Sequence, residues 1–418
     1  MPAPDVRKKV LVLLIGEVLE DPRVCKTCMS LCQSGAEVTV SCTNPSGKPA
    51  QEVRNGIHII RFPHRRDFFL KRMYNRLQGR IRPQFRRVVS RFHEDVPSSR
   101  FRTAIRNAVL LMNFRHFMGS SMKINRMMIH EFSGKTFDLV HCNDVDTLYA
   151  GNALRRSGAA KALLYDAHEY WPGIGVHGSA PNATLRKLEA KGIVHADYVV
   201  TVNPFIADMI REEYGLATLP SVVMNCPRLF EGPIHIDTVH SPVRVLYQGK
   251  VQAFRGLEEL VLAFKYIDSA ELTISGYGPL VERLELLAAT EGLSEKVHIT
   301  GGYTPDEALS IITNHDIGVL PFNPVTLSIM YSSPNKLFDF AMGGLALAVN
   351  DLPFLKRVIM EHGMGRVFSR NEPESIAETL NNMIADTEKL REYRHNARKA
   401  AEEHFYWEKQ FTNYPWHP

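Results

Sequence analysis

The chain has 418 residues, more than a single hydrophobic core usually organises, so we expect two domains of roughly 200 residues each. Hydrophobic residues make up 44% and charged residues 23%, as in an ordinary soluble protein. No apolar run reaches the ~18 residues that a membrane-spanning helix needs, so no such helix is predicted. The net charge of +5 hides a regional asymmetry.

Residues 9–15 are the first predicted strand. They follow a basic N-terminus, as the apolar part of a signal peptide does, but the run ends in Gly16 and Glu17 without a small-residue cleavage site. We therefore interpret the run as a buried strand and expect the protein in the cytoplasm. Asp21 and Pro22 then suit the N-cap and the first position of a helix.

The predicted helix at residues 22–34 carries three of the six cysteines, Cys25, Cys28 and Cys32, on one face. Their spacing is compatible with a metal or cluster site. We favour a buried helix face, because free cysteine packs well in cores and no second cysteine cluster is present to complete a tetrahedral site. Strands are predicted next at residues 37–42 and 57–62.

Residues 61–130 interrupt the alternation of strands and helices with a basic, helix-like insertion. It holds 15 arginines and 2 lysines against 3 acidic residues, a net charge of +14 that leaves −9 for the rest of the chain. Its interleaved aromatic residues favour an anionic membrane surface or an anionic acceptor. A solvated insertion whose arginines pair with the acidic remainder is the alternative. Nucleic acid is disfavoured, because no known binding module accompanies the charge.

Strands and helices alternate again after the insertion. Residues 227–242 lack periodicity and hold three prolines and a glycine, which predicts an interdomain linker, and a long helical tail is predicted at residues 386–410. The alternation in both halves predicts an α/β protein with two doubly wound parallel sheets. The further predicted strands are 138–141, 162–165, 198–202, 243–247, 271–275, 297–300, 317–321 and 345–349.

Candidate ligand-binding residues follow strands of the first half, because the carboxyl ends of parallel strands line the ligand crevice. Gly16 allows a close backbone approach, with a plain tight turn as an equal alternative. His141 and His168 lie at or just after the ends of two strands, where they would contact a substrate or be purely structural. The D-x-D sequence at residues 144–146 occurs in some metal sites, but we interpret it as chance at a helix start.

The second half carries a stronger signal in two consecutive turns from strand to helix. The first turn presents Gly249 and Lys250, followed by Arg255 and Gly256, and the second turn is the glycine-rich segment 276–279. Exposed N–H groups, helix N-termini and two cations on one sheet edge favour an anion. We therefore predict a site for a diphosphate, whose departure as a leaving group the cations would stabilise.

Residues 333–339 form a third candidate, ahead of Gly343 and Gly344. Pro334 suits the first turn of a helix with Ser333 as its cap. The carboxylate of Asp339 could accept two ribose hydroxyls, or it could simply complement the helix dipole.

Taken together and in this order, several segments resemble family 4 glycosyltransferases of the GT-B fold. The resemblance implies two Rossmann-like domains facing a central cleft and covers nearly the whole chain except residues 61–130. It implies an acceptor-binding domain at residues 1–228, a nucleotide-sugar-binding domain at 229–402 and a C-terminal helix at 403–418 that returns to the first domain. The matching segments are DPRVCKTCMSLCQSGAEVTV, DLVHCND, YDAHEY, ADYVVTVN, GKVQAFRG, SGYGPLVERL, VHITGGY, SPNKLFDFAMGG and HFYWEKQ.

The same resemblance implies roles for single residues. Lys250 and Arg255 would hold the donor diphosphate and act together with His168, which would lie beside the donor sugar. The resemblance further implies retention of the anomeric configuration, no metal and no cofactor, with the nucleotide sugar as substrate. The donor-binding residues would be Gly16, Gly249, Gly276, Gly278, Asn335, Lys336 and Asp339.

Two departures from the family pattern concern the donor site. The family has arginine and then lysine at the diphosphate, whereas this chain has Lys250 and then Arg255, so both positions stay cationic. The family's two glutamates, eight positions apart, become Tyr331 and Asp339. Tyr331 cannot replace a carboxylate in sugar recognition.

The expected activity is transfer of a sugar to a glycan or lipid-linked acceptor, in bacterial polysaccharide or glycolipid synthesis. The expected location is cytoplasmic, with peripheral attachment to the inner face of the plasma membrane through residues 61–130. A sugar-nucleotide epimerase or hydrolase of the same fold, or a non-catalytic nucleotide-sugar-binding protein, is the alternative.

Overall fold

A computed structural model describes residues 7–44, 48–63, 118–174 and 180–418. Most of the predicted basic insertion lies outside these residues. The chain forms two compact units. Their bounds are Met1–Ala167, Gly178–Val199 and Trp416–Pro418 for the first unit, and His168–His177 and Val200–Pro415 for the second.

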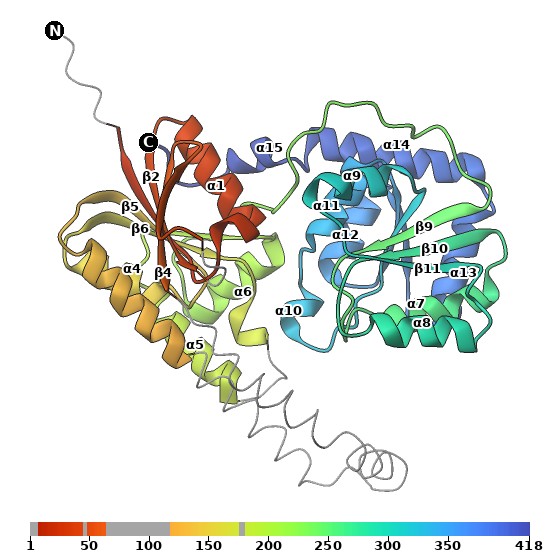
Figure 1. Cartoon of the computed structure of the whole chain (residues 1–418), viewed down its shortest axis with the longest axis horizontal. Coiled ribbons are helices and arrows are strands. Elements are labelled where there is room, and N and C mark those ends of the chain that lie inside the picture. The colour runs from red at the N-terminus through yellow and green to blue at the C-terminus, as the bar shows by residue number, and fades with distance from the viewer. Residues whose placement is uncertain (1–6, 45–47, 64–117, 175–179) are drawn as a thin grey trace, which may run out of the picture. The chain divides into compact units, whose positions relative to one another are not determined.

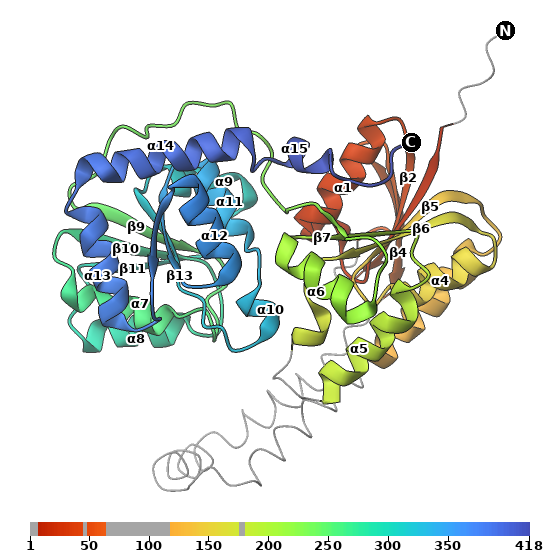
Figure 2. The same cartoon turned by 180° about the vertical axis from the view of Figure 1, so that it is seen from behind.

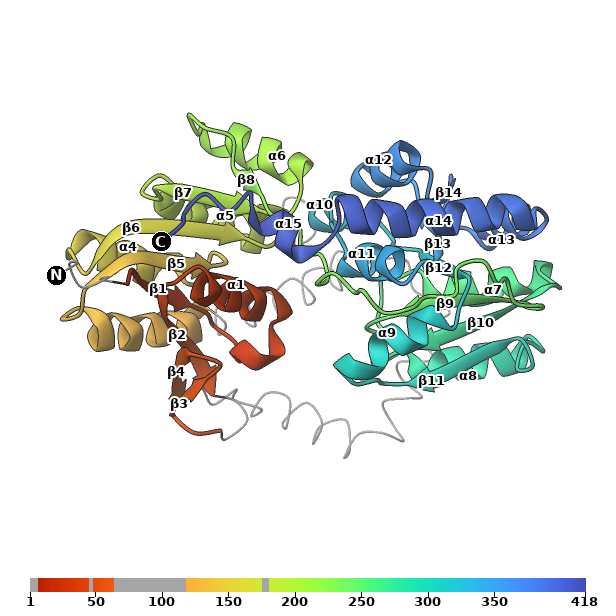
Figure 3. The ribbon, with the colours of Figure 1, turned by 90° about the horizontal axis from the view of Figure 1, so that it is seen from above.

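The first sheet has eight strands in the order β3-β4-β2-β1-β5-β6-β7-β8 (Figure 3). Its pairs are parallel where the register is defined, except that β3 runs antiparallel to β4 at the edge. The strands are β1 Lys9–Leu13, β2 Glu37–Asn44, β3 Gln51–Arg54, β4 Ile57–Pro63, β5 Phe137–Asn143, β6 Ala160–Ala167, β7 Tyr198–Thr201 and β8 Ser221–Val222.

Helices and short 3-10 turns connect these strands. The Asp21 side chain accepts the backbone N–H groups of Arg23 and Val24 at 3.0 Å each and Pro22 opens the first turn, so the predicted start of α1 is confirmed. Residues 118–132 are also helical. The elements are η1 Val18–Glu20, α1 Pro22–Gln33, α4 Leu148–Arg156, η2 Trp171–Gly173, α5 Ala180–Ile193 and α6 Pro204–Tyr214.

The second sheet has six parallel strands in the order β11-β10-β9-β12-β13-β14. This is the arrangement of a dinucleotide-binding domain, in which the strand order reverses between β9 and β12. Ligands bind such sheets beyond the carboxyl ends of the strands at that reversal. The strands are β9 Val243–Gln248, β10 Ala270–Ser275, β11 Val297–Gly301, β12 Ile317–Leu320, β13 Ala346–Asn350 and β14 Gly365–Phe368.

Helices cover both faces of the second sheet (Figures 1 and 2). Val245 and Tyr247 of β9 are buried in one core with α7, α8 and α13, and Leu246 is buried in the other with α11, α12 and α14. Burial on both faces explains the continuous apolar runs of these strands. The elements are α7 Leu257–Ala263, η3 Phe264–Tyr266, α8 Val281–Thr290, α9 Pro305–Thr313, α10 Leu327–Met330, α11 Asn335–Met342, α12 Pro353–His362, α13 Pro373–Ile384, α14 Thr387–Glu403 and α15 Trp407–Phe411.

The α/β prediction with two doubly wound sheets is confirmed, with differences at short elements. The strands β3, β8 and β14 were not predicted. The predicted long tail helix is two helices, because the chain leaves the helical conformation between Glu403 and Trp407. Residues 227–242 hold no helix or strand, as expected of a linker. The predicted domain boundaries stay a prediction.

The linker is nevertheless held by a buried arginine of α14. Arg394 is fully buried and donates to the carbonyl oxygens of Thr238 and of His235, the latter at 3.1 Å. It also contacts the Asp316 carboxylate at 3.0 Å. The linker therefore packs as part of the second unit rather than as a solvated connector.

Other predictions concern cysteines and membrane spans. Cys28 on α1 is buried, and burial raises the pKa of its thiol. Cys25 and Cys32 are partly exposed, so the buried face is confirmed for Cys28 alone.

Within the described ranges, no group of three or more His, Cys, Asp or Glu side chains could hold a metal. Among the same residues no helix is long and apolar enough to cross a bilayer.

Candidate active site

Gly16 lies in the loop after β1 in the first unit. Its carbonyl oxygen accepts the N–H of Thr43 at 2.9 Å. A Cβ at this position would contact only the side chain of Leu14, at 3.7 Å, and the φ angle is not left-handed. Neither packing nor backbone conformation therefore requires glycine here, and the predicted role in ligand approach stays a prediction.

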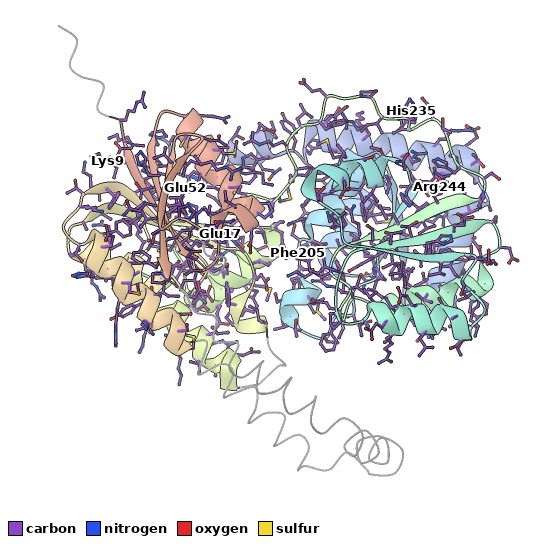
Figure 4. The ribbon with its side chains drawn as sticks, viewed as in Figure 1. Lys9, Glu17, Glu52, Phe205, His235 and Arg244 are labelled. Atoms are coloured by element: carbon purple, nitrogen blue, oxygen red, sulfur yellow. The ribbon has the colours of Figure 1, made fainter. Side chains whose placement is uncertain are left out.

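The loop after Gly16 is anchored by a buried ion pair. Glu17 is 3% exposed, and the Arg61 guanidinium donates to its carboxylate at 2.9–3.2 Å. Arg61 also donates to Glu52 at 2.8 Å. Figure 4 labels Glu17 and Glu52 in this part of the first unit. Because Arg61 satisfies both carboxylates, this cluster holds a loop rather than forming a catalytic pair.

A second buried ion pair lies at the strand reversal of the first sheet, between β1 and β5. Arg23 of α1 donates twice to Asp166 of β6, at 2.9 and 2.7 Å, and both side chains are at most 3% exposed. The fully buried ring of His141 lies 3.5 Å from the same carboxylate. Arg23 is thus neutralised by a bidentate contact with Asp166, and His141 packs beside this ion pair.

In the second unit, the loops after β9 and β10 are joined backbone to backbone. Gly249 donates its N–H to the Ser275 carbonyl, and Val251 donates to the Tyr277 carbonyl, both at 2.9 Å. Gly276 has φ +158°, and a Cβ on it would lie 1.8 Å from the Gly249 carbonyl oxygen. The two predicted glycine turns therefore touch each other, and this contact leaves no room for a side chain.

Gly278 is required for the same reason. A Cβ on Gly278 would lie 1.9 Å from the carbonyl oxygen of Val251. That oxygen accepts the N–H of Leu280 at 3.2 Å, just before α8 begins. Gly276 and Gly278 thus allow the two loops to pack closely together. The ligand contact predicted for these glycines stays a prediction.

The loops after β9 and β12 meet at the strand reversal. A Cβ on Gly256, whose φ is +67°, would lie 1.7 Å from the carbonyl oxygen of Pro321. Asn323 donates its N–H to the Phe254 carbonyl at 3.0 Å. The guanidinium of Arg255 lies over the ring of Phe322, 4.7 Å from its centre. This cation–π contact holds Arg255 at the edge where ligands bind in such sheets.

Lys250 is exposed one residue after Gly249. Its carbonyl oxygen accepts the Tyr247 hydroxyl at 2.9 Å, and burial raises the pKa of Tyr247 to about 12. In the described part of the chain, neither Lys250 nor Arg255 has a carboxylate within 4 Å. Two uncompensated cations therefore stand at the reversal of the second sheet, where the sequence predicts a diphosphate.

Helix α7 begins directly after Arg255 and Gly256. Its first turn already carries Glu258 and Glu259, and Glu258 pairs with Arg283. Acidic side chains at a helix N-terminus complement its dipole and repel a further anion. The attraction of a diphosphate to this helix end stays a prediction, and these two glutamates would weaken it.

Helix α11 places the third group of candidates. Lys336 contacts the Asp339 carboxylate at 2.8 Å, and its ammonium lies 5.5 Å from the centre of the Tyr303 ring. Burial lowers the pKa of Lys336, but Asp339 and Tyr303 outweigh this effect and raise it. Lys336 and Asp339 are both partly exposed, and Asn335 is the first residue of the helix.

The predicted Ser333 cap was wrong. Pro334 has an extended backbone and is itself the N-cap, so Ser333 lies one residue too early to cap α11. The Ser333 hydroxyl is buried and has no hydrogen-bond partner among the described residues. The start of α11 thus has no side-chain cap, and in its first turn only the N–H of Leu337 has a described acceptor, the Pro334 carbonyl at 3.0 Å.

His168 belongs to a segment that packs on α10 in the second unit. His168 is half-buried and Glu169 is exposed. The Ser328 hydroxyl donates to the Glu169 carboxylate at 3.1 Å. A Cβ on Gly173 would lie 2.8 Å from the Cβ of Leu327, so the segment touches α10 along its backbone.

The structure therefore brings together Gly249, Gly276 and Gly278, places Arg255 against Phe322, and pairs Lys336 with Asp339. Sequence reasoning missed three neighbours, Tyr303, Phe322 and Glu169, which lie far along the chain from the residues that they contact. Of these three, only Glu169 could have been suspected from the sequence, because it directly follows the candidate residue His168.

Two family descriptions match successive parts of the chain. Residues 21–226 match the glycosyl transferase 4-like domain, and residues 237–400 match glycosyl transferases group 1. A comparison with curated proteins found no match.

Solved structures with the same fold are similar over almost the whole chain. Sucrose-phosphate synthase from Thermosynechococcus elongatus is 15% identical with a TM-score of 0.69, covering 98% of this chain and 97% of that one. Anabaena Alr3699/HepE in complex with UDP and glucose is 13% identical with a TM-score of 0.66, covering 98% of both. An Escherichia coli structure described as trehalose-6-phosphate bound with UDP-2-fluoro glucose is 10% identical with a TM-score of 0.66, covering 97% of this chain and 98% of that one.

The similar structures agree with the two sheets, and the two family matches cover most of the chain. The chain therefore belongs to the GT-B glycosyltransferases, acts on a nucleotide-sugar donor and resembles family 4 within them.

Proposed function

We propose that the enzyme transfers a sugar with retention of anomeric configuration and without a metal ion, using Lys250 and Arg255 to stabilise the departing nucleoside diphosphate. The observation that carries the proposal is the pair of cations at the strand reversal, without carboxylate partners in the described chain. Charge builds on the phosphate oxygens as the glycosidic C–O bond breaks. Each cation at ~4 Å contributes about 4 kcal/mol of attraction at a dielectric near 20, before desolvation.

The other residues complete the donor site. Asp339, steered by Lys336, would accept the ribose hydroxyls, Asn335 would offer the uncapped start of α11, and His168 would lie beside the sugar. Gly249, Gly276 and Gly278 keep the loops close enough for backbone N–H groups to reach the phosphates. The family resemblance also implies a donor-binding role for Gly16.

A thermal-shift screen tests the donor site. The probes are UDP, GDP, UDP-glucose and GDP-mannose, with uridine nucleotides first because the Anabaena and Escherichia coli structures bind them. A ligand that binds the native state raises the melting temperature by mass action. No shift with any of the four probes would contradict the proposed site.

Product analysis tests the reaction. A transferase releases nucleoside diphosphate faster when acceptor is present, whereas an epimerase needs no acceptor. We expect an NMR spectrum of the product to show the anomeric configuration of the donor, and EDTA to leave the rate unchanged. An inverted product or a rate lost to EDTA would refute the corresponding part of the proposal.

The acceptor is proposed to be a glycan or a lipid-linked sugar, reached in the cytoplasm at an anionic membrane surface. The basis is the basic composition of residues 61–130. Flotation with vesicles of phosphatidylcholine alone or with phosphatidylglycerol tests this placement. We expect binding only to anionic vesicles and its loss at high salt; equal flotation with both would refute it.

A further inference from the structure

We propose that Glu169 is the carboxylate that binds the transferred sugar of the donor, at the corner formed by α10 and the start of α11. The inference rests on the proposed donor site and adds a residue that recognises the sugar rather than the diphosphate. Sugar hydroxyls donate to carboxylates in strong, charge-assisted hydrogen bonds. The corner itself, residues 326–335, contains no acidic residue.

Tyr331 occupies the position at which a carboxylate is expected, and its surroundings show why it does not serve as one. Its ring packs against Phe205, with 6.0 Å between the ring centres, and Asn203 donates to its carbonyl oxygen at 2.8 Å. Phe205, labelled in Figure 4, and Tyr331 both belong to the second unit. Tyr331 is therefore used for packing, and the acidic group must come from elsewhere in the chain.

Glu169 is the acidic side chain that the fold brings to this corner. Its carboxylate accepts the Ser328 hydroxyl at 3.1 Å, and Ser328 lies in α10, three residues before Tyr331, the C-cap of that helix. Ser328 is 7% exposed, so this anchor is itself buried, whereas Glu169 is exposed to solvent. The contact joins residues 159 positions apart.

The backbone fixes this placement. Gly173 approaches α10 so closely that a Cβ would lie 2.8 Å from the Leu327 Cβ and 3.1 Å from the Ser328 nitrogen. The hydroxyl of the buried Tyr170 donates to Glu213 at 3.2 Å. With both ends of the segment tied, Glu169 and its neighbour His168 are presented at one place, where the donor sugar is expected.

Calorimetric titration of full-length enzyme with UDP and with UDP-glucose tests the inference, and GDP with GDP-mannose replaces them if UDP does not bind. In Glu169→Gln we expect the Kd of the nucleotide sugar to rise roughly tenfold to a hundredfold, the range for a lost charge-assisted hydrogen bond. The Kd of the nucleoside diphosphate should stay within about twofold, because the diphosphate cations are untouched. Ser328→Ala should show a smaller change of the same kind.

Glu213→Gln is the matched control, since Glu213 holds the same segment through Tyr170 but lies outside the sugar site. It should leave the ratio of the two Kd values unchanged. Equal loss of both ligands in Glu169→Gln would show a purely structural role, and no change in either would overturn the inference. Failure of the wild type to bind either diphosphate would instead refute the donor site, and the inference with it.

Discussion

The two sheets reverse their strand order in the same way, yet they treat a cation at the reversal differently. In the first sheet, Arg23 is buried and paired twice with Asp166. In the second sheet, Arg255 packs on the ring of Phe322 and Lys250 is exposed. Among the described residues, neither cation has a carboxylate partner. A buried ion pair is an element of structure, whereas an unpaired cation at a ligand-binding edge retains its charge for an anion.

Equivalent places in the two sheets therefore differ in charge. Asp166 neutralises Arg23 at the first reversal, so that arginine adds no uncompensated positive charge there. The second reversal retains the positive charges of Lys250 and Arg255, where we propose the donor binds. Substitutions in the first should therefore change stability, and substitutions in the second should change donor binding and turnover.

The largest expected effect is that of Asp166→Asn. Loss of the carboxylate leaves Arg23 buried without compensation and should lower the free energy of unfolding by about 3–5 kcal/mol, measured by urea denaturation. Lys161→Met in the same strand removes an exposed ion pair with Asp138 and should cost less than about 1 kcal/mol. If both variants lost the same free energy of unfolding, the Arg23–Asp166 pair would not be a structural ion pair distinct from a surface one.

Arg255→Ala should lower turnover by about a hundredfold or more, as expected for loss of a key charge on the leaving group. Because Arg255 is in no described ion pair, the melting temperature of the variant should differ little from that of the wild type. Arg283→Ala, a surface arginine of the same unit, is the control and should retain full turnover. Near-normal activity of Arg255→Ala would remove the cation from the mechanism.

Gly276→Ala should lower both stability and nucleotide affinity, because its Cβ would overlap the Gly249 carbonyl. We expect a loss of about 1–3 kcal/mol in the free energy of unfolding. Gly16→Ala is the counterpart in the first unit, where space is open, and should change stability by less than about 0.5 kcal/mol. A well-tolerated Gly276→Ala would mean that the two donor loops are not tightly joined.

Tyr247→Phe should have the smallest effect, since it removes one hydrogen bond to Lys250, worth about 1 kcal/mol. Burial raises the pKa of Tyr247 from 10.0 to about 12, so folding favours the neutral phenol. Its contribution is present in full below pH 10 and is lost as the pH rises toward 12. The stability gap between wild type and variant should shrink across that window; a constant gap would contradict the burial of this hydroxyl.

Local signals in the sequence were sufficient for most of the fold. Apolar runs with glycine stops located the parallel strands, and Asp21 with Pro22 located the start of α1. The strand β3 was missed because it is polar and mostly exposed at a sheet edge, and β14 because it has only four residues. The predicted cap at Ser333 was wrong because Pro334 adopts an extended backbone and is itself the N-cap, instead of being the first residue of the helix.

The site was predictable where it depends on residues close in the chain and not where it depends on distant contacts. Glycines and cations within single loops could be identified from spacing alone. The pairing of Arg23 with Asp166 joins residues 143 apart, and that of Glu169 with Ser328 joins residues 159 apart. No local pattern distinguishes a cation that will be neutralised from one that will stay available.

The main-chain contacts between Gly249, Val251, Gly276 and Gly278 have a consequence for the divergence of such enzymes. Hydrogen bonds between peptide groups do not depend on side-chain identity, so neighbouring positions in these loops are free to change without moving the loops. A lineage could in this way change its surrounding side chains while the backbone of the joined loops keeps its shape.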